Sequence, residues 1–327
     1  LRPASVTKVM TLLLVMEALE DGRIGWDDMV TTSAAAAAKG GSQIYLEENE
    51  QLPLTEMLKS VVVSSANDCA CALAEHIAGS EAAFVQRMNE RAQELGMSDT
   101  HYDNCVGFDS DTHYTSAYDT AILSAAVSEN DCYNEFFNTR LDYVREGERQ
   151  TQLLNTNKLM QRYDGIIGGK TGTTDKAGCC LAVWAKRGNM KLCAVALGCK
   201  ESEQRFTACT DLLDYGFSGF ELYRTAVDSD VLTPVTVTEG LEKQADIRVK
   251  RLNTIVIPKG SSKRIEYTHT VVDSLSAPVQ YGEKVGEVRA SLDGEEIFYS
   301  DIVATGEVGE LNFFSSLLII IRRFFSM

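Results

Sequence analysis

The sequence predicts a mixed α/β domain over residues 1–222, a small all-β domain over 223–308 and an amphipathic helix over 309–327. Three observations lead to this fold class. Apolar residues recur with a helical period in most of the first 128 residues, and from about residue 165 the period becomes that of strands. Short strand-like runs split by Gly, Pro and Asp then continue beyond residue 231. The last sixteen residues gather their polar side chains in one arc of a helix.

Length and composition are those of a globular protein with a sizeable core. The 327 residues are 44% hydrophobic and 24% charged, which excludes a disordered chain. The formal net charge of −16 argues against a nucleic-acid partner, because phosphate binding needs a basic face. No stretch reaches the roughly 20 apolar residues that span a bilayer.

The first region is predicted to be rich in helices. Pro3 to about Glu20 keeps a helical period and ends at Asp21-Gly22. An Ala run at 34–38 and a Gly-Gly-Ser stretch at 40–42 follow. Four further helices are predicted, over Leu54–Val63, Asp68–Ile77, Glu81–Leu95 and Thr115–Ser128.

Beyond about residue 165 we expect strands. Gly178–Ala185 and Met190–Leu197 read as an antiparallel hairpin that turns at Arg187-Gly188-Asn189, and Phe206–Phe217 reads as a helix that closes the unit. A domain boundary is expected near Leu222–Val227, where the cysteines have ended. The predicted strands of the second domain are Val231–Val237, Ile247–Val249, Thr254–Ile257, Arg264–Thr270, Val285–Leu292 and Glu296–Ile302.

The nine cysteines follow neither a disulfide framework nor a zinc spacing. We interpret them as small buried hydrophobic side chains and expect neither a metal nor a cofactor. They stand at positions 69, 71, 105, 132, 179, 180, 193, 199 and 209. The four histidines, at 76, 101, 113 and 269, match no catalytic pattern and are interpreted as structural or surface residues.

Ser5-Val6-Thr7-Lys8 is the only S-x-x-K in the chain and lies on the first predicted helix. Positions i and i+3 of a helix share a face, so Ser5 Oγ and Lys8 Nζ can meet. A serine becomes nucleophilic when a base lies within hydrogen-bond reach. A lysine can be that base if burial or a nearby cation lowers its pKa. About one such motif is expected by chance in a chain of this size, so the motif alone is weak.

Two further motifs follow in order. Ser-x-Asn occurs at Ser65 and again at Ser128, where it resembles the end of a helix. Taken alone, Ser65 could be a helix N-cap, and its place 60 residues after Ser5 favours a functional role. Lys170-Thr171-Gly172 comes 105 residues after Ser65 in a glycine-rich segment, where a ligand backbone can approach a strand closely.

The order S-x-x-K, S-x-N and K-T-G resembles that of penicillin-binding proteins and serine β-lactamases. The segments Arg2–Thr11, Ser65–Ala70, Ala78–Phe84 and Asp164–Gly178 resemble the low-molecular-weight D-alanyl-D-alanine carboxypeptidases, and the similarity runs over almost the whole chain. It implies a transpeptidase-like domain, with an antiparallel sheet flanked by helices and a helical subdomain. Two strands precede the S-x-x-K helix in that family, so we expect this chain to lack them.

The resemblance also implies a role for each motif residue. Ser5 would be the acyl-enzyme nucleophile and Lys8 its general base. Ser65 would relay a proton to the leaving D-Ala, and Asn67 would hold Lys8 and the substrate amide. The opposite wall of the site would consist of Lys170, Thr171 and Gly172.

Two more residues are assigned to substrate binding by the same resemblance. The backbone N–H groups of Ser5 and Thr173 would form the oxyanion hole. Thr173 stands where some members have His, which a backbone role tolerates. Arg205, 35 residues after Lys170, would help to bind the terminal carboxylate, and its alternative is a surface arginine on a helix. The segment 105–108 departs from the family pattern at the floor of the pocket.

The implied activity is removal of the terminal D-Ala from peptidoglycan stem pentapeptides, a step in cell-wall biogenesis and cell shape. β-Lactam antibiotics would bind covalently. The enzyme would act outside the cytoplasm, on the outer face of the cytoplasmic membrane. The helix at 309–327 would lie on the membrane surface as a peripheral anchor, because residues 312–327 are too short to span it. No signal peptide is recognised in the chain.

Three other functional classes share some of these sequence features. A class A β-lactamase adds a Glu roughly one hundred residues past its nucleophile, but residues 97–128 contain no Glu, and the β domain is foreign to that class. A P-loop would need Gly at position 164, where Asp164 stands, and a helix after it, where a hairpin is predicted. A non-catalytic wall-associated relative is favoured only by the missing first strands.

Overall fold

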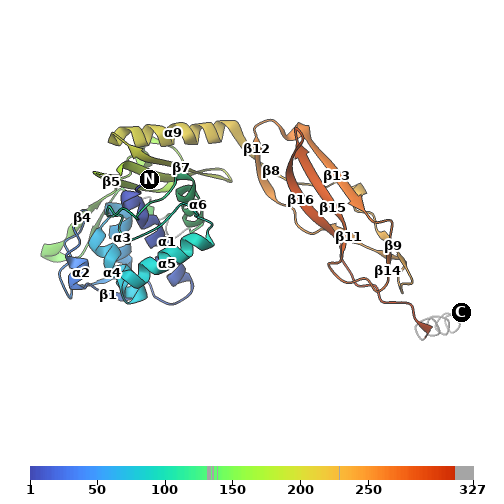
Figure 1. Cartoon of the computed structure of the whole chain (residues 1–327), viewed down its shortest axis with the longest axis horizontal. Coiled ribbons are helices and arrows are strands. Elements are labelled where there is room, and N and C mark those ends of the chain that lie inside the picture. Colours follow the sequence, from blue (N-terminus) through green and yellow to red (C-terminus); the bar gives the residue numbers. More distant parts are fainter. Residues whose placement is uncertain (131–133, 135, 138, 228, 314–327) are drawn as a thin grey trace. The chain divides into compact units, whose positions relative to one another are not determined.

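The computed structural model describes residues 1–130, 134, 136–137, 139–227 and 229–313 (Figure 1). Its contacts divide the chain into two units, Leu1–Phe217 and Ser218–Met327. None of the helices in these described ranges has both the length and the apolar character that crossing a bilayer requires. The predicted amphipathic helix over 309–327 lies outside the described residues from residue 314 onward.

The helices of the first unit follow the predicted pattern. The 3-10 turn η1 (Ala4–Thr7) runs directly into α1 (Lys8–Glu20), which is apolar on all sides and therefore buried almost along its whole length. The predicted helices over 3–20, 54–63, 68–77, 81–95 and 115–128 are confirmed with ends displaced by at most two residues. Besides α1, the helices whose bounds are described are α2 (Ala34–Ala37), α3 (Leu54–Ser64), α4 (Asn67–Ala78), α5 (Glu81–Glu94), α6 (Ala117–Ser128), α8 (Leu159–Arg162) and α9 (Ser202–Gly219).

The main sheet of the first unit has the strand order β5-β6-β7, and all its pairs are antiparallel. The predicted hairpin is confirmed as β6 (Gly178–Arg187) and β7 (Met190–Cys199), and β5 (Ile166–Thr174) carries the K-T-G motif. Two small antiparallel strand pairs that the sequence did not predict also occur: β1 (Met29–Thr31) with β2 (Gln51–Pro53), and β3 (Leu141–Val144) with β4 (Thr151–Leu154). A 3-10 turn, η2 (Gly147–Arg149), joins β3 to β4.

The central strand β6 is buried on both faces. Cys180, Ala182 and Trp184 pack into the helical core around α1 and α4. The alternate residues Leu181, Val183 and Ala185 pack against the buried face of α9, which Figure 1 shows running along the sheet. Because successive strand residues face opposite sides, a nearly continuous apolar run is what a strand between two layers needs. The sheet that contains β5 thus lies between the helical core and α9.

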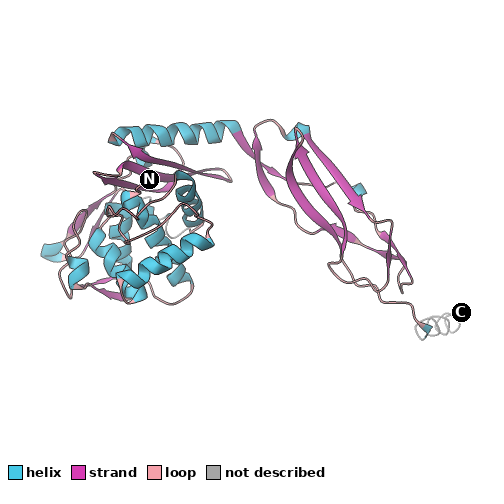
Figure 2. Ribbon diagram, viewed as in Figure 1, coloured by secondary structure: helices cyan, strands magenta, loops and turns pink. Residues whose placement is uncertain are grey.

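The second unit, which Figure 2 shows mainly as strands joined by loops, forms three sheets within the described residues. The predicted strand over 231–237 begins only at Val235, because the preceding segment forms the 3-10 turn η3 (Ser229–Val231) and Pro234 has no backbone N–H for a ladder. The other predicted strands are confirmed within two residues at each end. The largest of these sheets has the strand order β11 (Ile247–Val249), β16 (Glu295–Ala304), β15 (Lys284–Leu292) and β13 (Ile265–Val271). The second has the order β10 (Gln244–Ala245), β9 (Val235–Thr238) and β14 (Ser274–Ser276). The third pairs β12 (Thr254–Pro258) with β8 (Phe220–Arg224). The turn η4 (Ser262–Arg264) precedes β13.

Candidate active site

Strand β5 touches the turn that carries Ser5. A Cβ atom on Gly172 would lie 2.8 Å from the backbone nitrogen of Ser5 and 2.9 Å from the carbonyl oxygen of Pro3. Real Cβ atoms do not approach backbone atoms this closely, so only glycine fits at this point. Ala4 has φ 49°, a left-handed conformation that is unfavourable for alanine. The Lys170-Thr171-Gly172 motif therefore stands directly beside a strained turn at Ser5.

Ser5 and Lys8 are brought together as the spacing predicts. Lys8 Nζ donates hydrogen bonds to Ser5 Oγ at 2.8 Å and to the carbonyl oxygen of Val106 at 2.9 Å. Lys8 has no exposed surface. Burial, and after it the charge of Lys170, holds the pKa of Lys8 well below its usual value. A lysine in this state can accept the proton of the serine hydroxyl.

Ser65 and Asn67 stand between α3 and α4. Ser65 is the C-cap of α3 in a left-handed conformation (φ 65°) and is not a helix N-cap. Asn67 Nδ2 donates to the carbonyl oxygen of Gly40 at 2.6 Å. Ser65 Oγ and Asn67 Oδ1 are buried, and within the described residues neither has a hydrogen-bond partner. Buried polar atoms are nearly always paired, so these two atoms are available to a ligand.

The segment Asn104–Phe108 is part of the site, although sequence reasoning assigned it no role beyond the pocket floor. The Val106 carbonyl accepts a hydrogen bond from Lys8, and a Cβ atom on Gly107 would lie 1.8 Å from the carbonyl oxygen of Ala4. Asn104 Oδ1 accepts hydrogen bonds from the backbone N–H groups of Gly107 at 2.7 Å and Phe108 at 2.9 Å. An Asn that caps a glycine turn was the available signal in the sequence.

Lys170 and Thr171 line the β5 side of the site. Lys170 is buried, and its Nζ donates to the carbonyl oxygen of Thr171 at 3.0 Å. Burial and the nearby charge of Arg205 lower the pKa of Lys170 to about 7. The hydroxyl groups of Thr171 and Thr156 are hydrogen-bonded at 2.6 Å, which adds a loop residue to the same wall.

Arg205 reaches from α9 to the end of the K-T-G motif. Its Nη1 donates to the carbonyl oxygen of Gly172 at 2.9 Å and to Thr173 Oγ1 at 3.0 Å. Thr173 Oγ1 in turn donates to the Gly172 carbonyl at 2.7 Å. Arg205 Nε is buried, and no partner for it is present in the described part of the chain. Arg205 is therefore a buried cation at the site and not a surface arginine.

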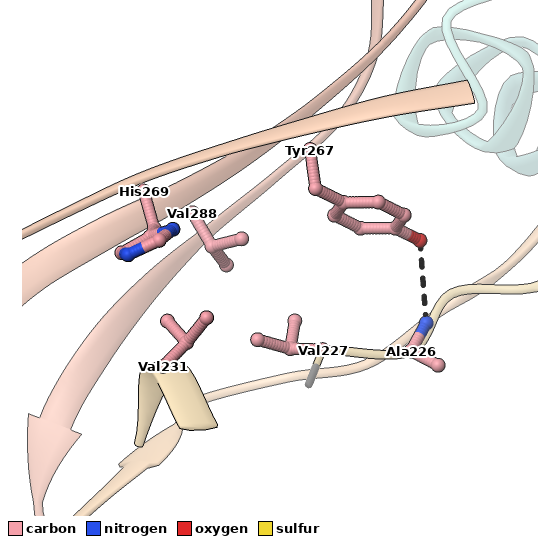
Figure 3. A pocket seen from close by; sticks show the side chains of 6 residues that line it. All are labelled: Ala226, Val227, Val231, Tyr267, His269 and Val288. Atoms are coloured by element: carbon pink, nitrogen blue, oxygen red, sulfur yellow. Dashed lines mark hydrogen bonds between the residues drawn. The ribbon is translucent and has the colours of Figure 1, made fainter. Parts of the chain in front are cut away.

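Among the described residues, neither His113 nor His269 has a hydrogen bond to one of the predicted site residues. His113 is buried, its Nε2 hydrogen-bonds Thr7 Oγ1 at 2.8 Å, and burial lowers its pKa to about 4, as expected for a structural residue. His269 lines a separate cavity of about 440 Å³ in the second unit with Tyr267, Val231 and Val288 (Figure 3). Figure 3 shows a mainly apolar lining, and it includes none of the predicted site residues.

Comparisons with known proteins show the family of the chain. The family profile described as D-alanyl-D-alanine carboxypeptidase matches residues 1–201, and the profile described as penicillin-binding protein 5, C-terminal domain, matches residues 220–310. The chain is 38% identical to the D-alanyl-D-alanine carboxypeptidase DacF of Bacillus subtilis, over 97% of this chain and 82% of that protein. It is 32% identical to the D-alanyl-D-alanine carboxypeptidase DacA of Escherichia coli, over 99% and 81% of the two chains.

The fold is likewise that of solved structures. The crystal structure of penicillin-binding protein 5 from Haemophilus influenzae matches with a TM-score of 0.83 and 30% identity, and the match covers 95% of this chain and 91% of that one. Penicillin-binding protein 6B from Escherichia coli matches with a TM-score of 0.75 and 26% identity, over 93% and 87%. The predicted transpeptidase-like domain followed by an all-β domain is confirmed.

Proposed function

The chain belongs to the D-alanyl-D-alanine carboxypeptidase family and is a serine peptidase, and from this premise we propose that it removes the terminal D-Ala of peptidoglycan stem peptides with Ser5 as nucleophile. The observation that carries the proposal is the 2.8 Å hydrogen bond from the buried Lys8 amine to Ser5 Oγ. Covalent capture of β-lactams at the same serine follows, because a strained cyclic amide acylates the same nucleophile.

In the acylation step, Ser5 Oγ attacks the carbonyl carbon between the two D-Ala residues while the neutral amine of Lys8 takes the hydroxyl proton. The negative charge on the carbonyl oxygen is stabilised by the backbone N–H groups of Ser5 and Thr173. Ser65 passes a proton to the amine of the leaving D-Ala, and Asn67 hydrogen-bonds the substrate amide. Water then hydrolyses the Ser5 ester, and Lys8 again acts as the base.

Substrate binding is proposed for the other wall of the site. The stem peptide adds alongside β5, which is an edge strand of the sheet β5-β6-β7. Lys170, Thr171 and Arg205 supply the charged and polar groups for the terminal carboxylate. In support, Arg205 Nε is a buried donor without a partner among the described residues.

Incubation with a labelled penicillin tests the nucleophile. The mass of the chain should rise by one adduct that maps to the peptide containing Ser5. The Ser5→Ala variant should lose both the adduct and the release of D-Ala. Ser128→Ala is the matched control, because Ser128 belongs to the other Ser-x-Asn sequence and is the last residue of α6, where its Oγ donates to the carbonyl oxygen of Ala125. An adduct that persists in Ser5→Ala would refute the assignment, and a wild-type chain without any adduct would identify a non-catalytic relative.

We also propose the cellular arrangement: a catalytic domain over 1–222, a β domain over 223–308 that acts as a spacer, and a peripheral anchor over 309–327 on the outer face of the cytoplasmic membrane. Its two arginines, Arg322 and Arg323, would meet anionic headgroups. Deleting 312–327 should release the protein from anionic vesicles and leave D-Ala release from a soluble peptide intact. Vesicle binding that survives the deletion would rule out the anchor.

A further inference from the structure

Two cysteines and a glutamate meet behind the Lys8 side of the site. Cys71 lies on α4, Glu81 is the first residue of α5, and Cys105 precedes Val106. One ligand atom from each of the three residues lies within 4.8 Å of the other two. Cys105 Sγ is 3.2 Å from Glu81 Oε1, and Cys71 Sγ is 4.0 Å from Glu81 Oε2. Both cysteines are fully buried, and 25% of the Glu81 side chain is exposed.

We propose that Cys71, Glu81 and Cys105 bind one thiophilic divalent cation of the Zn²⁺ class. Two sulfurs and a carboxylate oxygen are a donor set that zinc accepts. Zn–S bonds of about 2.3 Å place two sulfurs about 3.8 Å apart in a tetrahedral site. The ligand atoms of the three residues lie within 4.8 Å of one another, so only a small inward movement of the side chains is needed to bind the cation. Water is the fourth ligand, or Glu75, whose Oε1 lies 3.8 Å from Cys71 Sγ.

The charges around the cluster balance when the cation is bound. On binding, both thiols release their protons to solvent, and two thiolates with one carboxylate carry three negative charges. The divalent cation and the ammonium of Lys39, which donates to Glu81 Oε2 at 2.6 Å, neutralise them. Lys39 donates to Glu81 Oε2, so Oε1 remains on the side of Cys105. A hydrogen bond of this kind, from outside the metal site, orients a carboxylate that binds a metal.

The position of the cluster links it to the segments that hold the catalytic side chains. The Cys105 carbonyl accepts a hydrogen bond from Thr11 Oγ1 at 2.6 Å, and the next carbonyl, that of Val106, accepts from Lys8. Lys39 precedes Gly40, whose carbonyl accepts from Asn67 Nδ2. A cation here joins α4, α5 and the segment before Val106 through three coordinate bonds. The spacing of these ligands resembles no zinc pattern, so the sequence alone predicted no metal.

Cobalt and zinc titrations test the site. The reduced, metal-free full chain should bind about one equivalent of Co²⁺ with a thiolate-to-cobalt charge-transfer band in the near ultraviolet, and Zn²⁺ should displace it. Zn²⁺ should also raise the Tm in a concentration-dependent manner, because it binds the folded chain. Cys71→Ser and Cys105→Ser should lose the band. Cys69→Ser is the matched control: Cys69 is equally buried on the same helix but is not one of the three ligands, so it should keep the band.

Cooperative thermal unfolding of each variant shows whether it has folded. If a serine variant does not fold, Glu81→Gln serves instead and should weaken Zn²⁺ binding at least about tenfold. A wild-type chain without the cobalt band would overturn the proposal, as would an unchanged band in folded Cys105→Ser. The reduced chain can also be exposed to air in the presence of Zn²⁺. If a Cys71–Cys105 disulfide then forms, the two cysteines are a redox pair and the proposal is overturned.

Discussion

Lys170 lowers the pKa of Lys8, and both side chains are buried at the same site. Burial has the largest effect on Lys8, and the charge of Lys170 has the next. Burial, and after it the charge of Arg205, lowers the pKa of Lys170 to about 7. Three basic side chains, those of Arg205, Lys170 and Lys8, therefore follow one another from α9 across β5 to α1. The arrangement favours the neutral amine of Lys8, which is the form that can accept a proton from Ser5.

Removing the charge of Lys170 should move the acid limb of the pH profile for acylation to higher pH. Without that cation the pKa of Lys8 rises, so a smaller fraction of its amine is neutral at a given pH. The measurement is the rate of acylation by a labelled penicillin across mildly acidic and neutral pH in Lys170→Gln, because Lys170, with its pKa of about 7, carries its charge in that range. Lys170→Arg keeps the charge and is the matched control. Identical acid limbs in the two variants would show that Lys170 does not influence the base.

Gly172→Ala should lower the acylation rate by about a hundredfold or more. The added Cβ would have to displace the backbone at Ser5, and a displacement of about 1 Å at a reacting group costs roughly this factor. Gly219→Ala is the control, because a Cβ atom there meets nothing within 4 Å. If the folded Gly172→Ala variant is acylated at the wild-type rate, β5 and the Ser5 turn can move apart without cost to the reaction.

Arg205→Ala should reduce kcat/KM for D-Ala release by about tenfold or more, since a charge-assisted hydrogen bond is worth roughly 1.5–3 kcal/mol. Peptides with a free and with an amidated C-terminus distinguish carboxylate binding from a positioning role of Arg205. If Arg205 binds the carboxylate, the loss of kcat/KM in Arg205→Ala should be much larger for the peptide with the free carboxylate. Equal losses would instead assign Arg205 to positioning Thr173, through its 3.0 Å hydrogen bond to Thr173 Oγ1.

The buried His113 should make the chain less stable in mild acid. Its pKa is about 4 in the folded chain against about 6.5 when exposed, so the unfolded chain binds more protons between these values. Stability attributable to His113 is complete above about pH 6.5. It should fall by roughly 2–3 kcal/mol as the pH approaches 4.

The structure supplies the reason and the control for this acid sensitivity. His113 Nδ1 accepts a hydrogen bond from the Asp103 N–H at 3.0 Å, and protonation would break it. Chemical denaturation at several pH values should therefore show a flatter pH dependence for His113→Gln than for the wild type. His269→Gln, at an exposed residue of the second unit, should keep the wild-type slope. A wild-type slope in folded His113→Gln would contradict this account.

Much of the fold could be predicted from the sequence because the deciding signals are local. The apolar run of β6 and the turn at Gly188 follow from neighbouring residues alone, as do the helices from α3 to α6. The strands of the pairs β1–β2 and β3–β4 have too few residues for a clear alternation, and their pairing depends on packing against α3 and α4, which lie elsewhere in the chain.

The sequence by itself determined the order of the motifs, the helix that joins Ser5 to Lys8 and the strand that carries Lys170, since each depends on residues a few positions apart. Only the tertiary structure decided which of these elements meet. It placed Gly172 against Ser5, Val106 against Lys8, and Cys105 beside Glu81 and Cys71. These contacts join residues far apart in the chain. They depend on the packing of several elements at once, which leaves no periodic trace in the sequence.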